Sequence, residues 1–413
     1  MYLEIDPVRA HVLRTVKDTH DVLLGFEMRD LDGYYRTGAC QQSEEHLSVR
    51  YNAAQPPYSV TKTALAVSTQ RIPSLDGLRA ISITLVILSH LVKWKHISLQ
   101  VLGSFGALGV HVFFVLSGYL ITSLLLREYE RTSAISLRDF YIRRAYRIFP
   151  AAFVFLAVVT ALYWQQIRWY HAAAAVLYVA NMDIWRPWIF GHLWSLSIEE
   201  QFYLLWPYAI KKWQRHKVAI LLCVSAVTPV FQAGLYAFRV HNGLIASLPV
   251  YADQLAIGCL LAIFAPRIPK IRGSWALTML LAMLLIPWFP ASSALRSIFM
   301  LFVLRPLLNV SIAGLVLHVI QVPYQALNWS PVAWLGRISY SLYLWQELFC
   351  SNASLHLGYF LVVPALASAC LSYYCVEQPM LRLREKRGAR PRERKQATAG
   401  LGVRNAILDT SKT

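Results

Sequence analysis

The sequence has few charged residues for its length. Of its 413 residues, 15% are charged, whereas charged residues make up roughly a quarter of a typical soluble chain. The hydrophobic fraction is 56% and the mean hydropathy is +0.43. These values exclude an intrinsically disordered chain and argue against a soluble enzyme. They predict that most of the chain lies in lipid.

Cysteine is also sparse. There are six cysteines, with no CxxC pair and no metal-ligand spacing, which excludes a disulfide-rich scaffold and predicts no metal site. The first 70 residues contain no basic segment followed by an apolar run and a small-residue cleavage site, so no signal peptide is expected there. No internal repeat is visible.

Long apolar runs begin near residue 75. A membrane-spanning helix needs about 20 mostly apolar residues, and ten segments satisfy that length approximately. They are 76–95, 107–126, 147–164, 193–211, 217–236, 248–266, 274–289, 297–317, 332–350 and 357–376. An eleventh candidate, 171–190, is interrupted by Asn181, Asp183, Arg186 and Pro187. We interpret it as an interfacial or re-entrant segment. The predicted fold is an all-α integral membrane bundle of about ten transmembrane helices.

The net charge of +18 would suggest nucleic-acid binding in a soluble protein, but in a membrane protein it bears on topology instead. With both termini in the cytoplasm, the short inner loops hold thirteen Lys and Arg, at 127, 131, 138, 143, 144, 147, 211, 212, 215, 217, 267, 270 and 272. The outer loops hold six, at 93, 95, 168, 186, 239 and 296. Cytoplasmic loops carry the excess of Lys and Arg, so both termini are predicted to be cytoplasmic and no nucleic-acid partner is expected.

Three regions follow from this topology. Residues 1–70 form a polar extension, predicted to be cytoplasmic and a candidate for disorder. Residues 71–380 form the transmembrane domain, and residues 381–413 form a basic cytoplasmic tail.

The first span carries ionisable residues, which inside a membrane are functional candidates by default. Asp76 and Arg79 lie at its start and His90 lies well inside it. Eleven residues separate Arg79 from His90, which places both side chains on a similar helix face about 16.5 Å apart. That distance resembles the length of the pantetheine arm of coenzyme A. The alternative for His90 is a core histidine bonded to a neighbouring helix, and Asp76 is either a helix cap or a partner of Arg79.

Polar residues recur in and beside two further spans. Arg144 and Arg147 lead into the third span, and the planar guanidinium group of arginine is suited to phosphate contacts. Topology alone also requires a basic loop there. Glu199 and Glu200 lie two turns into the fourth span. They are candidates for a general base, and the alternative is a structural hydrogen bond to a neighbouring helix. Beside them we single out His192 and Ser195.

Two further motifs look mainly architectural. GALGVHVFFVLSGYLIT contains His111 among glycines that allow close helix approach, and GRISYSLYLWQELF carries an aromatic stripe that includes Tyr343 and Trp345. Aromatic stripes in spans usually serve packing, although sugars also bind aromatic faces.

Six motifs in order carry a family resemblance. They are RIPSLDGLRAISITLVILSH, GVHVFFVLSGYLITSLLLRE, ISLRDFYIRRAYRIFPA, HLWSLSIEEQFYLLWP, LGRISYSLYLWQ and YYCVEQPMLRLR. Residues 71 to about 387 resemble the membrane acyltransferase 3 family, which O-acylates bacterial surface glycans and related acceptors. The length after the last span resembles the family's stand-alone form without a C-terminal hydrolase-like domain.

The resemblance implies an enzyme of the bacterial inner membrane. It would move an acyl group, expected to be acetyl, from cytoplasmic acyl-CoA to a hydroxyl of a saccharide or similar acceptor at the outer face. No cofactor is expected to be bound permanently, and the expected partners are membrane lipid, acyl-CoA and the acceptor. The family's Arg–ten residues–His signature falls on Arg79 and His90, and its Arg-x-x-Arg signature falls on Arg144 and Arg147.

These assignments make His90 the leading catalytic residue, as general base or transient nucleophile, and the three arginines the acyl-CoA contacts. Glu199 and Glu200 lie in HLWSLSIEEQFYLLWP, which matches a motif of the family. The residues expected on the acceptor side or in a supporting role are Asp76, His111, His192, Ser195, Tyr343 and Trp345. His111 and Gln346 depart from the commoner family pattern, which affects the acceptor pocket most. The alternatives are a transporter or flippase of a lipid-linked glycan and a purely structural scaffold.

Overall fold

The computed structural model describes residues 72–92, 100–238, 247–286, 294–350 and 358–386. The predicted extension 1–70 and most of the tail 381–413 lie outside these residues. The regular secondary structure of the described residues is entirely helical, with no strand. Backbone amides and carbonyls find no water in a lipid core, and a helix satisfies them within its own segment.

The principal helices follow the predicted spans closely. They are α2 (Pro73–Val92), α3 (Gln100–Thr132), α4 (Leu137–Leu162), α6 (Leu193–Lys212), α7 (Lys217–Ala237), α8 (Leu248–Phe264), α9 (Gly273–Leu285), α11 (Arg305–Gln321), α14 (Ser339–Cys350) and α15 (Val362–Ser372). Shorter helices are α5 (Trp169–Val176), α10 (Ala294–Phe299), α12 (Gln325–Asn328) and α13 (Ser330–Arg337).

Several spans contain more than one helical piece. The segment 294–321 joins α10 to α11 through a π-helical turn, Met300–Leu304, and the segment after α15 continues through a second one, Tyr373–Glu377, and on to residue 386. The helix therefore passes the predicted domain boundary at residue 380. The candidate 171–190 is not one helix but α5 followed by two single 3₁₀ turns, in keeping with its interpretation as a non-spanning segment.

Six helices in the described residues are long and apolar enough to cross a membrane: Pro73–Leu91, Phe105–Thr132, Leu137–Leu162, Gln214–Ala237, Leu248–Arg267 and Leu295–Gln321. Large apolar side chains are exposed on the outside of the bundle, among them Leu162, Leu204, Leu222, Val230, Leu285, Val310, Val363 and Leu371. Such a surface is suited to lipid rather than water. The chain is a multi-pass membrane protein, while the count of ten spans stays a prediction.

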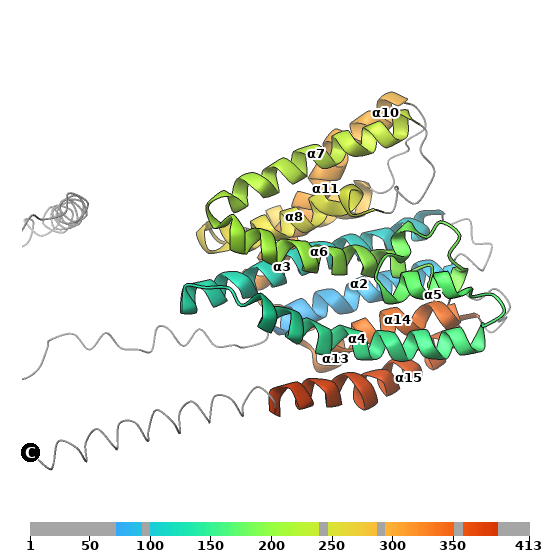
Figure 1. The fold of residues 1–413 in the computed structure, drawn as a ribbon. Helices are drawn as coiled ribbons and strands as arrows, with labels where there is room; N and C mark the ends of the chain where they lie inside the picture. Colours follow the sequence, from blue (N-terminus) through green and yellow to red (C-terminus); the bar gives the residue numbers. More distant parts are fainter. Residues whose placement is uncertain (1–71, 93–99, 239–246, 287–293, 351–357, 387–413) are drawn as a thin grey trace, which may run out of the picture. The chain divides into compact units, whose positions relative to one another are not determined.

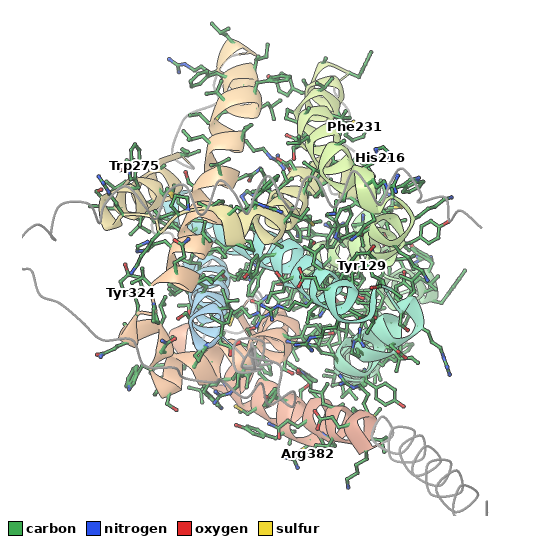
Figure 2. All side chains as sticks on the ribbon, turned by 90° about the vertical axis from the view of Figure 1, so that its left-hand side faces the viewer. Tyr129, His216, Phe231, Trp275, Tyr324 and Arg382 are labelled. Atoms are coloured by element: carbon green, nitrogen blue, oxygen red, sulfur yellow. The ribbon has the colours of Figure 1, made fainter. Side chains whose placement is uncertain are left out.

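The long helices lie side by side, and connections with basic residues gather at one end (Figure 1). The turns between α3 and α4 and between α6 and α7 both lie there. Figure 2 looks toward this end, where Tyr129, His216 and Arg382 are labelled. The clustering agrees with the charge argument, and the cytoplasmic location of this end stays a prediction.

Helices α3 and α8 approach each other closely, backbone to backbone. A Cβ added to Gly118 would lie 2.1 Å from the Leu255 carbonyl oxygen, and one added to Gly258 would lie 2.2 Å from the Val115 carbonyl oxygen. Small residues let membrane helices pack backbone to backbone. Gly118 is one of the glycines predicted to allow close helix approach, and it does so here.

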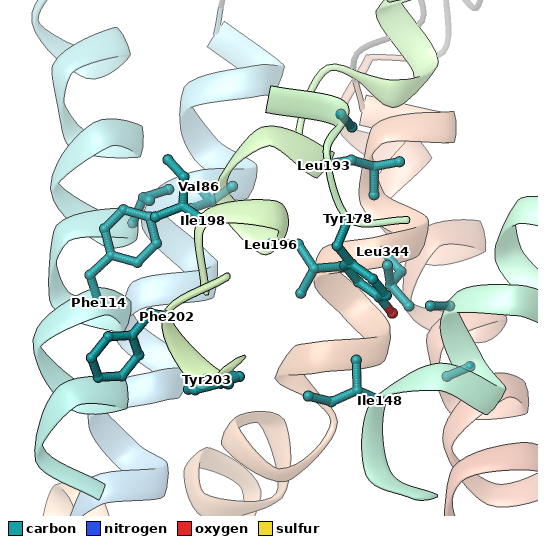
Figure 3. Packing of buried hydrophobic residues seen from close by; sticks show 14 of the residues in the cluster. Val86, Phe114, Ile148, Tyr178, Leu193, Leu196, Ile198, Phe202, Tyr203 and Leu344 are labelled. Atoms are coloured by element: carbon teal, nitrogen blue, oxygen red, sulfur yellow. The ribbon is translucent and has the colours of Figure 1, made fainter. Parts of the chain in front are cut away.

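Helix α6 lies between two groups of helices. Figure 3 shows Ile198, Phe202 and Tyr203 toward the side of Val86 and Phe114, while Leu193 and Leu196 face Tyr178 and Leu344. Phe114 and Ile198 are fully buried in one cluster with Leu344. The helices that carry the predicted site residues therefore share one packed core.

Candidate functional site

The ends of α2 carry two of the predicted site residues. At its start, the Arg79 Nη1 group donates a hydrogen bond of 3.0 Å to Asp76 Oδ1, and Asp76 is only 2% exposed. His90 lies in the last turn of the same helix. The Asp76 carboxylate, about one turn before Arg79 on the helix, holds the Arg79 guanidinium in place.

A cavity of about 180 Å³ opens beside Arg79. We call it the arginine cavity because Arg79, Arg144 and Arg147 all line it, from α2 and α4. Its apolar wall comes mainly from α3 and α6, with Phe113, Phe114, Leu116, Leu120, Ile121 and Leu196. The structure thus brings the three predicted acyl-CoA contacts together.

The charge in the arginine cavity is mainly positive. Three guanidinium groups face one lining carboxylate, that of Glu199. The Arg144 guanidinium lies over the Tyr203 ring, 3.7 Å from its centroid, and its buried Nε atom has no hydrogen-bond partner among the described residues. A planar guanidinium with a spare donor is suited to bidentate contact with phosphate oxygens.

Glu199 is held by hydroxyl groups. Its Oε1 atom accepts hydrogen bonds from Ser117 of α3 and from Tyr203, one turn further along α6. The oxygen atoms of the Tyr203 and Ser117 hydroxyls lie 3.0 Å apart. The two hydroxyls orient the carboxylate in the wall of the arginine cavity.

A second cavity, of about 360 Å³, contains His90 and His192, and we call it the histidine cavity. Its other charged lining residues are Arg186, from the segment before α6, and Glu347, from α14. Val110 and Tyr343 line both cavities. Arg79 therefore lines one cavity and His90 lines its neighbour, and the two cavities share Val110 and Tyr343 in their walls.

His90 is bonded through one ring nitrogen. Its Nδ1 atom lies 2.7 Å from Gln346 Oε1. A carbonyl oxygen only accepts, so Nδ1 carries a proton in this bond, and in the neutral imidazole Nε2 then holds the lone pair. The bond thus leaves one basic nitrogen of His90 available for chemistry.

Tyr343 marks the junction of the cavities. Its hydroxyl lies 2.5 Å from Ser195 Oγ and donates to the His192 carbonyl oxygen at 3.0 Å. The His192 ring packs edge-on against Tyr343, with their centroids 5.4 Å apart. Three residues predicted on the acceptor side therefore lie together, between the arginines and His90.

Comparison with known proteins places this geometry in a family. A family model described as an acyltransferase domain matches residues 72–376. The chain belongs to this acyltransferase family. The match covers every helix that lines the two cavities. No solved structure matches the chain.

Curated relatives of the acyltransferase include a peptidoglycan O-acetyltransferase of Listeria monocytogenes, 31% identical over 69% of this chain and 50% of the relative. A putative peptidoglycan O-acetyltransferase of Bacillus subtilis is 31% identical over 75% and 55%. An O-acetyltransferase of Staphylococcus aureus is 32% identical over 68% and 50%. The chain spans about half the length of the curated relatives it matches.

Several predicted site residues of the acyltransferase do not line either described cavity. Glu200 is adjacent to Glu199, yet its buried Oε1 has no hydrogen-bond partner among the described residues. His111 faces Tyr251 of α8, with ring centroids 6.5 Å apart, and Trp345 packs edge-on against Phe155. His111 and Trp345 thus pack against aromatic rings.

Sequence reasoning did not select three residues that line or support the histidine cavity. The sequence indicates Arg186 as an outer-loop charge that interrupts 171–190, and Gln346 and Glu347 as the end of an aromatic motif. The one available signal was the departure of Gln346 from the commoner family residue. Its bond to His90 spans 256 positions in the sequence, which a single sequence does not reveal.

Glu199 lines the arginine cavity and the adjacent Glu200 does not, so variants of the two residues can be compared directly. We expect Glu199→Gln to lower acyl transfer at least about 10-fold, because the Glu199 carboxylate holds the Ser117 and Tyr203 hydroxyls, and the Tyr203 ring supports the Arg144 guanidinium. Glu200→Gln should lower it much less, since Glu200 does not line the cavity. Initial rates of the two purified variants provide the measurement, and equal rates would contradict the distinction.

Proposed function

We propose that the chain is a membrane O-acyltransferase that moves an acetyl group from acyl-CoA to a hydroxyl of a saccharide acceptor. The observation that carries the proposal is the junction of the two cavities. Three arginines line one, His90 lines the other, and Val110 and Tyr343 belong to both. A donor with an anionic head and a long neutral arm matches this arrangement.

The donor end of the proposal rests on charge and length. Arg79, Arg144 and Arg147 hold the phosphates of coenzyme A through charge-assisted hydrogen bonds. From Arg79 the pantetheine arm runs along α2 toward His90, over about 16.5 Å of helix rise. The apolar wall of the arginine cavity accommodates the neutral part of the arm.

The acceptor end rests on the relatives and the histidine cavity. The named relatives include peptidoglycan O-acetyltransferases, so we propose an envelope saccharide as acceptor. In the proposed topology, ten spans cross the bacterial inner membrane with both termini in the cytoplasm. The arginine cavity then faces the cytoplasm and the histidine cavity faces outward.

The proposed chemical step uses the free nitrogen of His90. The Nε2 lone pair takes the proton from the acceptor hydroxyl as that oxygen attacks the thioester carbonyl carbon. The new ester C–O bond forms and the C–S bond breaks. The coenzyme A sulfur leaves and takes the proton from His90, so the enzyme ends in its starting state. An acetyl-His90 intermediate, detected after rapid quenching, would replace this step by nucleophilic catalysis.

The function is tested with the purified full chain, acetyl-CoA and muropeptide fragments of peptidoglycan as the probe acceptor. We expect release of free coenzyme A thiol that requires the protein, together with an acetyl ester on the saccharide seen by mass spectrometry. A flippase would move glycan without consuming acetyl-CoA. Absence of thiol release and ester, in a sample that remains folded, would contradict the proposal.

A further inference from the structure

A buried carboxylate lies between the two histidines of the histidine cavity. Glu347 Oε2 is 3.5 Å from His90 Nδ1 and 3.8 Å from His192 Nδ1. Glu347 is only 6% exposed. A protein with an apolar residue of similar volume at such a position is often at least as stable. A carboxylate that contacts two imidazoles therefore points to a role beyond packing.

An amide connects this carboxylate to His90. The Gln346 Oε1 atom accepts from His90 Nδ1 at 2.7 Å, and the Gln346 Nε2 atom donates to Glu347 Oε2 at 3.1 Å. Gln346 is fully buried. The opposite amide orientation would aim its carbonyl oxygen at the carboxylate, acceptor against acceptor. The carboxylate therefore fixes the amide, and the amide fixes which nitrogen of His90 carries the proton.

We propose that Gln346 and Glu347 are positioning residues that prepare His90 for proton transfer. This inference rests on the proposed function of His90. Gln346 holds the tautomer with its proton on Nδ1, so that Nε2 faces the reaction with its lone pair. When Nε2 takes the acceptor proton, the His90 ring becomes positively charged. The Glu347 carboxylate, 3.5 Å from Nδ1, stabilises this positive charge in a low-dielectric site.

The other described residues that line the histidine cavity do not supply this negative charge. Ser89 and Tyr343 are neutral donors or acceptors, Arg186 is cationic, and His192 is a second imidazole. Among the residues that line the histidine cavity, Glu347 is the one carboxylate. The role therefore belongs to Glu347 rather than being shared along the cavity wall.

The test separates kcat from KM. Glu347→Gln keeps the size of the side chain but removes its charge, and Gln346→Leu removes the acceptor for His90 Nδ1. We expect each variant to lower kcat for acetyl transfer to muropeptide at least about 10-fold. The KM for acetyl-CoA should stay within about 2-fold, because the arginine cavity is unchanged. Glu347→Asp should recover a measurable part of kcat.

The rate of the wild-type protein in the same assay shows whether a failure concerns the proposed function or only the positioning role of Gln346 and Glu347. If the wild type transfers no acetyl group, the proposed function fails. If the wild type is active and Glu347→Gln keeps full kcat, the positioning role alone fails. A purely structural role would lower the folded fraction, measured by size-exclusion chromatography, without a specific fall in the kcat of the folded protein. That result would also overturn the inference.

Discussion

Replacing His90 by alanine is expected to abolish detectable acetyl transfer while leaving the protein in the membrane. His90 lines the histidine cavity, and its Nδ1 bond to Gln346 leaves Nε2 as the free basic nitrogen. Positioned proton transfer typically contributes about 10²–10⁴-fold to a rate, so the loss should exceed most assay ranges. The measurement is ester formation from acetyl-CoA and muropeptide by equal amounts of membrane-extracted protein.

The control for His90 is another histidine. His216 lies in the turn between α6 and α7 and is exposed, so His216→Ala changes the same atoms far from both cavities. We expect it to keep the rate of the wild type. An active His90→Ala enzyme would remove His90 from the mechanism, whatever the behaviour of the control.

The second large effect is expected at the arginines. Arg144→Ala and Arg147→Ala should each raise the KM for acetyl-CoA by about 10- to 100-fold. A hydrogen bond to a charged group contributes about 1.5–3 kcal/mol, and each 1.4 kcal/mol corresponds to roughly a factor of ten in affinity. The KM for the acceptor should change little, because the arginines line the other cavity. Initial rates at varied acetyl-CoA with fixed muropeptide, and at varied muropeptide with fixed acetyl-CoA, give the two KM values.

Arg143 is the matched control for these variants. It precedes Arg144 on α4, but its guanidinium is 41% exposed and pairs with Glu128 at 2.9 Å, outside the arginine cavity. Arg143→Ala removes the same charge, and an exposed ion pair contributes only about 0–1 kcal/mol to stability. We expect an unchanged KM for acetyl-CoA. Equal KM values for the Arg143 and Arg144 variants would show that general charge, rather than the cavity, attracts the donor.

The helices of this protein were largely predictable because their signal is local. Each of the ten predicted segments is helical within the described residues, and Asn181, Asp183 and Pro187 correctly marked 171–190 as irregular. A run of apolar residues determines a membrane helix without reference to the rest of the chain. The arginine cavity was also predictable in part, because family motifs carried Arg79, Arg144 and Arg147.

The contacts between helices were not predictable in the same way. Adjacent residues on α6 have different surroundings, and only the helix rotation in the bundle places Glu199 in the cavity wall and Glu200 outside it. The link from His90 to Gln346 and Glu347 depends on how α2 packs beside α14. Rotation and register of distant helices are set by tertiary packing, such as the close approach of Gly118 to Leu255, and not by local sequence.

The central claim is that acyl-CoA, taken up at the arginine cavity, is consumed at the histidine cavity. The most direct measurement uses sealed vesicles that contain the protein, with labelled acetyl-CoA on one side and muropeptide on the other. We expect label to appear as an ester on the muropeptide, with one coenzyme A thiol released per ester. Glycan movement without thiol release, or ester formation only when donor and acceptor share one side, would contradict the account.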